Sequence, residues 1–158
     1  MSFQVDFYPR TWKKGTGLGG DAAGVSSMDL KEKAKLLVRT VNGLSGRVVV
    51  VEGKRDALAL QKCGIFFGAV AAVGKPERVV EKAGATGRVS LLFDFDDEGE
   101  RKTRVFSELF RCAGAEVDTL SRKRFRQVLG ITFFEEMPAK LREFEEKMKM
   151  QKICEKVI

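Results

Sequence analysis

The stretch Val89-Ser-Leu-Leu-Phe-Asp-Phe-Asp-Asp-Glu-Gly-Glu100 decides the fold of this 158-residue chain, because an apolar run ends there in a dense acidic segment. Five of the seven residues from 94 to 100 are carboxylates. A second apolar run, Val48–Val51, ends in the same way, in Glu52-Gly-Lys-Arg-Asp56. Short apolar runs bounded by turn residues predict buried strands. Two buried strands that each end at an acid predict one shared metal site.

The pattern from residue 47 onward alternates between strand and helix. Strands are predicted over residues 48–51, 65–73, 88–93 and 116–120, and helices over 56–63, 77–83 and 98–113. Strands that are apolar on both faces and separated by helices are typical of a parallel sheet covered by helices on both sides. We therefore expect an α/β, Rossmann-like fold of about four parallel strands, with an extra N-terminal helix and a C-terminal helical extension.

Four segments follow from this reading of the chain. Residues 1–27 form a glycine-rich, flexible arm, 28–46 a leading helix capped by Asp29, 47–120 the α/β core, and 121–158 a basic helical extension. Aromatic residues beside Lys13 and Lys14 suit an arm that stacks on bases. An apolar staple onto the body, or a frayed tail, is the preferred interpretation of these residues. The last helix, opened by Pro138, either packs on the sheet or binds a partner protein.

Composition limits the chemistry that the chain can perform. The net charge of +7 favours polyanionic partners, although simple solubility also explains it. Histidine is absent, which excludes Ser-His-Asp catalysis and His-ligated metals. Three scattered cysteines, no secretory signal and no apolar run near ~20 residues predict a cytoplasmic protein that does not enter a membrane. Oxygen ligands alone suit Mg²⁺ or Mn²⁺.

The strongest candidate ligands are the acids at the two strand ends. Ligands of open α/β sheets bind at the carboxyl ends of the strands, where Glu52 and Asp94 are expected. Alternation along the strand predicts that Asp94 and Asp96 share a face while Phe95 turns to the core. Asp56 is a further candidate ligand, or a cap of its own helix. The structural alternative for Asp97, Glu98 and Glu100 is also helix capping.

Basic residues flank the acids and cluster again further along the chain. Lys54, Arg55, Arg101 and Lys102 are candidates to hold substrate phosphates. The densest basic cluster supplies Arg122, Lys123, Arg124 and Arg126, which are expected to hold a nucleic-acid backbone. A solvated helix face is the alternative for this cluster, and half burial is the alternative to base stacking for Phe125.

The motifs Val-Val-Glu52-Gly-Lys-Arg-Asp56 and Phe-Asp94-Phe-Asp96-Asp-Glu-Gly99-Glu resemble the two signature motifs of TOPRIM domains. That fold is shared by topoisomerases, bacterial primases, overcoming-lysogenization-defect nucleases and 5S ribosomal RNA maturation ribonucleases. The resemblance covers roughly residues 47–120. It implies that Glu52 is the acid/base carboxylate and that Asp94 and Asp96 bind Mg²⁺, with Asp56 a secondary candidate.

A small stand-alone protein similar to the 5S maturation ribonucleases is the nearest type, because the chain has neither the tyrosine domain of a topoisomerase nor the zinc module of a primase. We therefore expect a Mg²⁺-dependent phosphodiester hydrolase of nucleic acid, with RNA favoured over DNA and a role in RNA processing. A non-catalytic nucleic-acid-binding module in an RNA-processing or replication assembly is the competing class. Primase-like nucleotidyl transfer is a third possibility.

Overall fold

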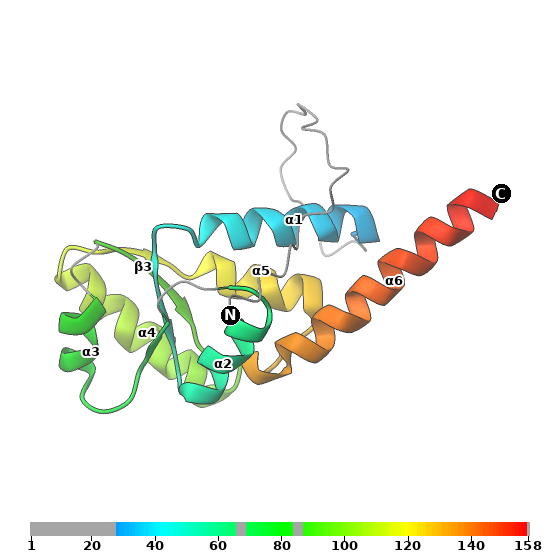
Figure 1. Cartoon of the computed structure of the whole chain (residues 1–158). Helices are drawn as coiled ribbons and strands as arrows, with labels where there is room; N and C mark the ends of the chain where they lie inside the picture. Colours follow the sequence, from blue (N-terminus) through cyan, green and yellow to red (C-terminus); the bar gives the residue numbers. More distant parts are fainter. Residues whose placement is uncertain (1–27, 66–68, 84–86, 158) are drawn as a thin grey trace, which may run out of the picture.

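A single parallel sheet lies at the centre of the chain (Figure 1). The computed structural model describes residues 28–65, 69–83 and 87–157, so the predicted arm of residues 1–27 lies outside the described residues. The four strands are β1 (Val48–Val51), β2 (Val70–Ala71), β3 (Arg88–Leu92) and β4 (Glu116–Asp118). They are hydrogen-bonded in the order β2-β1-β3-β4, and every neighbouring pair is parallel. The predicted α/β fold of four parallel strands is confirmed.

Six α-helices flank the sheet within the described residues. They are α1 (Leu30–Gly43), α2 (Lys54–Lys62), α3 (Pro76–Ala83), α4 (Asp97–Cys112), α5 (Leu120–Leu129) and α6 (Met137–Val157), with a short 3₁₀ turn, η2, at Phe134–Glu136. Asp29 caps α1 as predicted, because its carboxylate accepts a 2.8 Å hydrogen bond from the N–H of Glu32. Pro76 stands at the first position of α3, where its missing N–H costs nothing.

Two apolar cores cover the two faces of the sheet. Val49 and Val51 of β1 and Leu92 of β3 point into the core formed with α1, α2, α5 and α6. Val50 of β1 and Leu91 of β3 point to the opposite side, into the core formed with α3 and α4. This alternation is the period-two pattern of a strand that is buried on both faces. Helices α2, α3, α4 and α5 each follow a strand of this parallel sheet, so their N-termini and the loops before them lie at its carboxyl end.

Three strands are shorter than the sequence predicts, and β3 is shorter by one residue only, since it ends at Leu92. Of the expected strand over 65–73, residues 66–68 lie outside the described residues, and among the others only Val70 and Ala71 form the strand β2, an edge strand with β1 as its one described neighbour. Val73 is exposed. The expected strand over 116–120 ends at Asp118. Its carboxylate accepts hydrogen bonds from the N–H groups of Leu120 and Ser121 and so begins α5 at this point.

Helix α6 packs on the body through its first half only. Leu141, Phe144 and Met148 contact the core, whereas Ile153 and Val157 are exposed, so the predicted apolar face does not continue to Ile153. Figure 1 shows the C-terminal part of α6 running away from the sheet. An ion pair of 2.9 Å between Lys31 and Glu155 links this part to α1. In the described part of the chain, no helix combines the length and hydropathy that crossing a bilayer requires.

Candidate metal and nucleic-acid site

An open pocket of about 450 Å³ lies at the carboxyl ends of β1 and β3. Glu52 and Asp94 follow directly on these two strands, which are paired from Val48↔Val89 to Val51↔Leu92. Both line the pocket together with Asp56, which lies in the first turn of α2. The structure therefore brings three of the four predicted metal ligands to one place.

Asp94, like Asp56, is a buried acid of this pocket. Its Oδ1 accepts a 2.8 Å hydrogen bond from the backbone N–H of Phe134, at the start of η2. Burial is the main reason why the pKa of Asp94 is raised to about 6, and the charges of Asp56, Glu52 and Asp96 raise it further. The Phe134 N–H acts in the opposite direction. The raised pKa means that the ionised form of Asp94 is less stable here than it is in water. A bound cation would stabilise this ionised form.

Asp56 has the capping role that was its alternative interpretation. Its Oδ2 accepts a 3.0 Å hydrogen bond from the N–H of Gly53, the residue that precedes α2. Burial raises the pKa of Asp56, and the negative charges of Glu52 and Glu135 add to this effect. Because the hydrogen bond occupies one carboxylate oxygen, Asp56 can cap its helix and still face the pocket with the other oxygen.

Glu52 has one oxygen paired and one unpaired. Its Oε2 lies 3.4 Å from the ammonium group of Lys102, which reaches across from α4. Its Oε1 is buried and has no hydrogen-bond partner in the described structure. A buried acceptor without a partner costs free energy, on the order of 1–3 kcal/mol. This atom is therefore placed to gain from any cation or donor that enters the pocket.

Asp96 is arranged differently from the prediction. It is exposed, it caps α4, and its Oδ1 accepts a 2.7 Å hydrogen bond from the N–H of Gly99. It is not among the residues that line the pocket. Phe95 turns to the core as predicted and packs against it, although its side chain stays half-buried. The structure thus holds Asp96 beside the pocket, close enough for its charge to affect the pKa of Asp94.

The candidate ligands are of the chemical type that binds a hard divalent cation, but the structure does not bring them together into a complete coordination site. Within the described ranges, no three acids, cysteines or histidines stand in a group that could hold a metal ion. Every candidate donor is a carboxylate oxygen, as Mg²⁺ and Mn²⁺ prefer. A bound cation would give Oε1 of Glu52 a partner and would stabilise the ionised form of Asp94, whose pKa is raised.

The four basic residues beside the acids divide into two pairs. Lys54 and Arg55 are exposed and line the pocket, where they are available to a phosphate. Arg101 and Lys102 instead form ion pairs with Glu98, at 2.7 and 3.7 Å. Glu98, predicted as a possible capping acid, therefore serves as a partner for these two cations. Lys102 remains inside the pocket because it also pairs with Glu52.

The basic cluster on α5 does not present a single face. Phe125 is fully buried in the core, so base stacking is excluded for it. Arg122 is only 2% exposed, and its donors are directed to Phe93, Asp94 and Glu100. The structure places Arg122 differently from the expectation that it holds a nucleic-acid backbone, because its guanidinium is buried and already hydrogen-bonded within the protein. Arg124 is half-buried.

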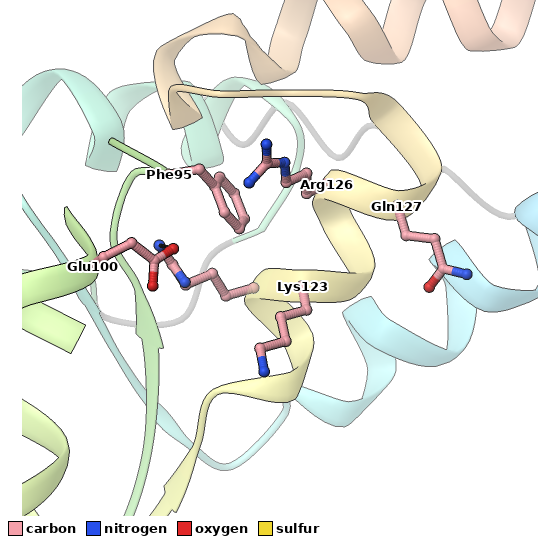
Figure 2. Close-up of a pocket in the computed structure, with 6 residues that line it drawn as sticks. Phe95, Glu100, Lys123, Arg126 and Gln127 are labelled. Atoms are coloured by element: carbon pink, nitrogen blue, oxygen red, sulfur yellow. Dashed lines mark hydrogen bonds and ion pairs between the residues drawn. The ribbon is translucent and has the colours of Figure 1, made fainter. Parts of the chain in front are cut away.

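Lys123 and Arg126 do remain exposed, and they line a second open pocket of about 440 Å³. Figure 2 shows Arg126 of α5 facing the ring of Phe95, and the guanidinium carbon lies 4.8 Å from the ring centroid. Glu100 and Gln127 complete the pocket with Arg122. The basic pocket and the acidic pocket are adjacent in the chain, because Phe95 lines the basic one and the preceding residue, Asp94, lines the acidic one.

Three contributions to the site were missed in the sequence. They are the N–H of Phe134 bound to Asp94, the ion pair of Lys102 with Glu52, and the carboxylate of Glu135 in the acidic pocket. The acidic Phe133-Phe-Glu-Glu136 segment was the available signal for the first and third. Nothing in the local pattern placed this segment next to Asp94, 40 residues earlier.

A parallel sheet with strand-end acids at one pocket defines a class of α/β domains that bind a ligand at the carboxyl edge of the sheet. The family model described as "Toprim domain" matches residues 46–120, and the chain belongs to this family of TOPRIM-domain proteins. Membership indicates a metal-binding function connected with nucleic acids, since TOPRIM domains generally bind divalent metal ions.

One solved structure, described as a putative protein from Aquifex aeolicus, is similar to this chain. The two sequences are 31% identical, the TM-score is 0.57, and the similarity covers 65% of this chain and 95% of the other. The comparison with curated proteins found no match.

Proposed function

We propose that this protein is a Mg²⁺- or Mn²⁺-dependent phosphodiester hydrolase of nucleic acid, with RNA as the favoured substrate in RNA processing. The observation that carries the proposal is the shared pocket of Glu52, Asp56 and Asp94, with one orphaned oxygen on Glu52. The free thiols of Cys63, Cys112 and Cys154 support a location in the reducing cytoplasm.

The acids in and beside the pocket would bind the metal in this proposal, and Glu52 would have a second role. Asp94 and Asp96, with Glu52 and Asp56, are the residues that would hold the metal. A bound divalent ion would neutralise charge on the phosphate and lower the pKa of a bound water. Glu52 would take a proton from the attacking water. The oxygen of this water would form a bond to phosphorus while the bond from phosphorus to the leaving oxygen breaks. Lys102 is within reach of the same carboxylate and would bind a phosphate oxygen.

The exposed cations around the two pockets suit the backbone of a nucleic acid. Lys54 and Arg55 line the acidic pocket, and Lys123 and Arg126 line the basic one. Because Asp94 lines the acidic pocket and the next residue, Phe95, lines the basic one, a nucleic-acid strand crossing both would place one phosphate at the acids and others beside α5. Charge contacts of this kind give affinity that falls with salt and carries no sequence information.

The test is cleavage of an end-labelled structured RNA and a DNA of the same sequence, with Mg²⁺ or Mn²⁺. Glu52→Gln and Asp94→Asn should each abolish cleavage, as should EDTA, while Glu108→Gln, an exposed acid on α4, should leave it unchanged. Discrete products from wild-type protein that persist in Glu52→Gln would contradict the assigned site. A requirement for nucleoside triphosphates would instead indicate nucleotidyl transfer.

A non-catalytic binding module is the second candidate, and one observation favours it. The described residues hold no finished metal-ligand group, and Lys102 already balances the charge of Glu52. A protein of this kind would shift RNA in a gel without forming products, and the shift would survive EDTA. The protruding half of α6 would then be a surface for a partner protein.

A further inference from the structure

The carbonyl groups at the end of β3 lack the usual strand neighbours. Strand β1 pairs with β3 only as far as Leu92, and β4 pairs only as far as Ser90. The carbonyls of Phe93 and Asp94 therefore extend beyond both neighbouring strands, in a buried position. A buried carbonyl needs a donor from elsewhere, because leaving it unpaired costs free energy comparable to a lost hydrogen bond.

Arg122 supplies those donors from α5. Its Nε donates to the carbonyl of Phe93 at 2.6 Å, and its Nη2 donates to the carbonyl of Asp94 at 2.5 Å. The same Nη2 lies 2.8 Å from Oε1 of Glu100, in the first turn of α4. One planar guanidinium therefore joins the end of β3 to the start of α4, on both sides of the loop that carries Asp94 and Asp96.

The ring of Phe95 completes this arrangement. The guanidinium carbon of Arg122 lies 4.2 Å from the centroid of Phe95, which follows Asp94 directly. Stacking of this kind adds to the hydrogen bonds of an arginine but not to those of a lysine, whose ammonium has no planar face. Burying a charge costs free energy unless the charge is paired and hydrogen-bonded. The complete set of partners of Arg122 explains why its guanidinium is tolerated at 2% exposure.

We propose that Arg122 is a positioning residue, which holds the acidic loop, residues 94–96, and the first turn of α4 in the conformation that binds metal. Arg122 lies outside the Toprim match at residues 46–120, so the C-terminal extension would form part of the working site. The inference rests on the proposed metal site. Arg122 itself contacts neither metal nor substrate in this proposal, and it acts through the backbone of Phe93 and Asp94.

The test measures Mn²⁺ affinity by titration calorimetry in wild type and in Arg122→Lys, with Arg104→Lys as an exposed arginine control on α4. Groups that orient metal ligands typically change affinity 10–100-fold when replaced. We therefore expect Arg122→Lys to weaken Mn²⁺ binding at least tenfold and Arg104→Lys to leave it unchanged. A lower melting temperature with unchanged Mn²⁺ affinity would show that Arg122 serves stability alone and would overturn the proposal.

A second pair of variants covers the case in which Arg122→Lys fails to fold. Glu100→Gln and Glu98→Gln remove equally exposed carboxylates from one turn of α4, but only Glu100 pairs with Arg122. Both changes remove one negative charge near the pocket. Weaker Mn²⁺ binding in Glu100→Gln than in Glu98→Gln supports the proposal, and equal binding in the two contradicts it.

Amide hydrogen exchange separates this proposal from the metal site itself. If wild type does not bind Mn²⁺, the proposed function fails, and the loop can still be examined in Arg122→Lys. The N–H groups of Phe95, Gly99 and Phe134 should then exchange faster, because all three are hydrogen-bonded within or to the loop. An equal acceleration at Val50 in the sheet would indicate global destabilisation and count against positioning.

Discussion

The backbone N–H of Phe134 donates a 2.8 Å hydrogen bond to Oδ1 of Asp94, across 40 residues of sequence. A second bond runs beside it, from the N–H of Phe95 to the carbonyl of Thr132 at 2.9 Å. The segment after α5 therefore lies along the acidic loop and leaves Oδ2 of Asp94 outside this bond. An acid fixed by one oxygen keeps a defined orientation for the other.

Asp94→Asn should stabilise the metal-free protein at pH 8. The folded-state pKa of about 6 lies above the ordinary value of 3.8, so folding favours protonated Asp94. This stabilising contribution is complete below pH 3.8 and is lost as the pH rises through 6. Asparagine keeps the oxygen that accepts from Phe134 without carrying the charge. We expect a gain of about 1–3 kcal/mol in the free energy of unfolding at pH 8, since one pKa unit corresponds to about 1.4 kcal/mol.

Urea denaturation with EDTA, at pH 8 and at pH 4, measures this gain. The difference between Asp94→Asn and wild type should shrink towards zero at pH 4, because wild-type Asp94 becomes protonated there. A difference of the same size at both pH values would mean that the charge of Asp94 is not its source.

Mn²⁺ binding should weaken as the pH falls below about 6. A metal ligand must be deprotonated, and the raised pKa of Asp94 places its titration near this value. With one proton displaced, the apparent affinity should fall about tenfold for each pH unit below 6. The residual, weaker binding of Asp94→Asn should not show this step near pH 6. Mn²⁺ titrations between pH 4.5 and 8 make the comparison, and a wild-type affinity that stays constant over this range would contradict the assignment of Asp94 as a ligand.

Gly99→Ala should disrupt the acidic loop, whereas Gly53→Ala should leave the fold intact. A Cβ at Gly99 would lie 2.6 Å from the carbonyl carbon of Asp94 and closer still to its oxygen, so backbone would have to move. A Cβ at Gly53 would meet Oδ2 of Asp56 at 3.9 Å, an ordinary contact. We expect Gly99→Ala to cost at least about 2 kcal/mol, in the range of strongly disruptive substitutions, and to abolish Mn²⁺ binding.

Thermal melts and Mn²⁺ titrations of the two glycine variants provide the measurement. Gly43→Ala, at the end of α1 with no atom within 4 Å of the added Cβ, is the matched control for the substitution itself. A Gly99→Ala protein that melts with the control would show that the loop has room that this structure does not contain. If Gly53→Ala keeps its stability but loses cleavage, the glycine is required for the approach of a phosphate rather than for folding.

Much of the architecture was predictable because it depends on local pattern. Apolar runs such as Val48–Val51 specify strands that are buried on both faces, and the helices between them require a parallel sheet. The edge strand β2 was less predictable, since its length depends on pairing with β1 rather than on its own apolar residues. Asp118 shortened β4 for a similar reason, through hydrogen bonds to the next helix.

The sequence by itself determined the sheet, the acids at its carboxyl edge and the Toprim motifs, because strand periodicity and the order of motifs are written along the chain. Only the tertiary structure decided which side chains meet there. It placed Lys102 against Glu52, turned Asp96 into a helix cap and buried Arg122 beneath the Asp94 loop. The physical reason is that burial and hydrogen bonding depend on neighbours distant in sequence, so a basic cluster on one helix can contain both a solvated arginine and a buried one.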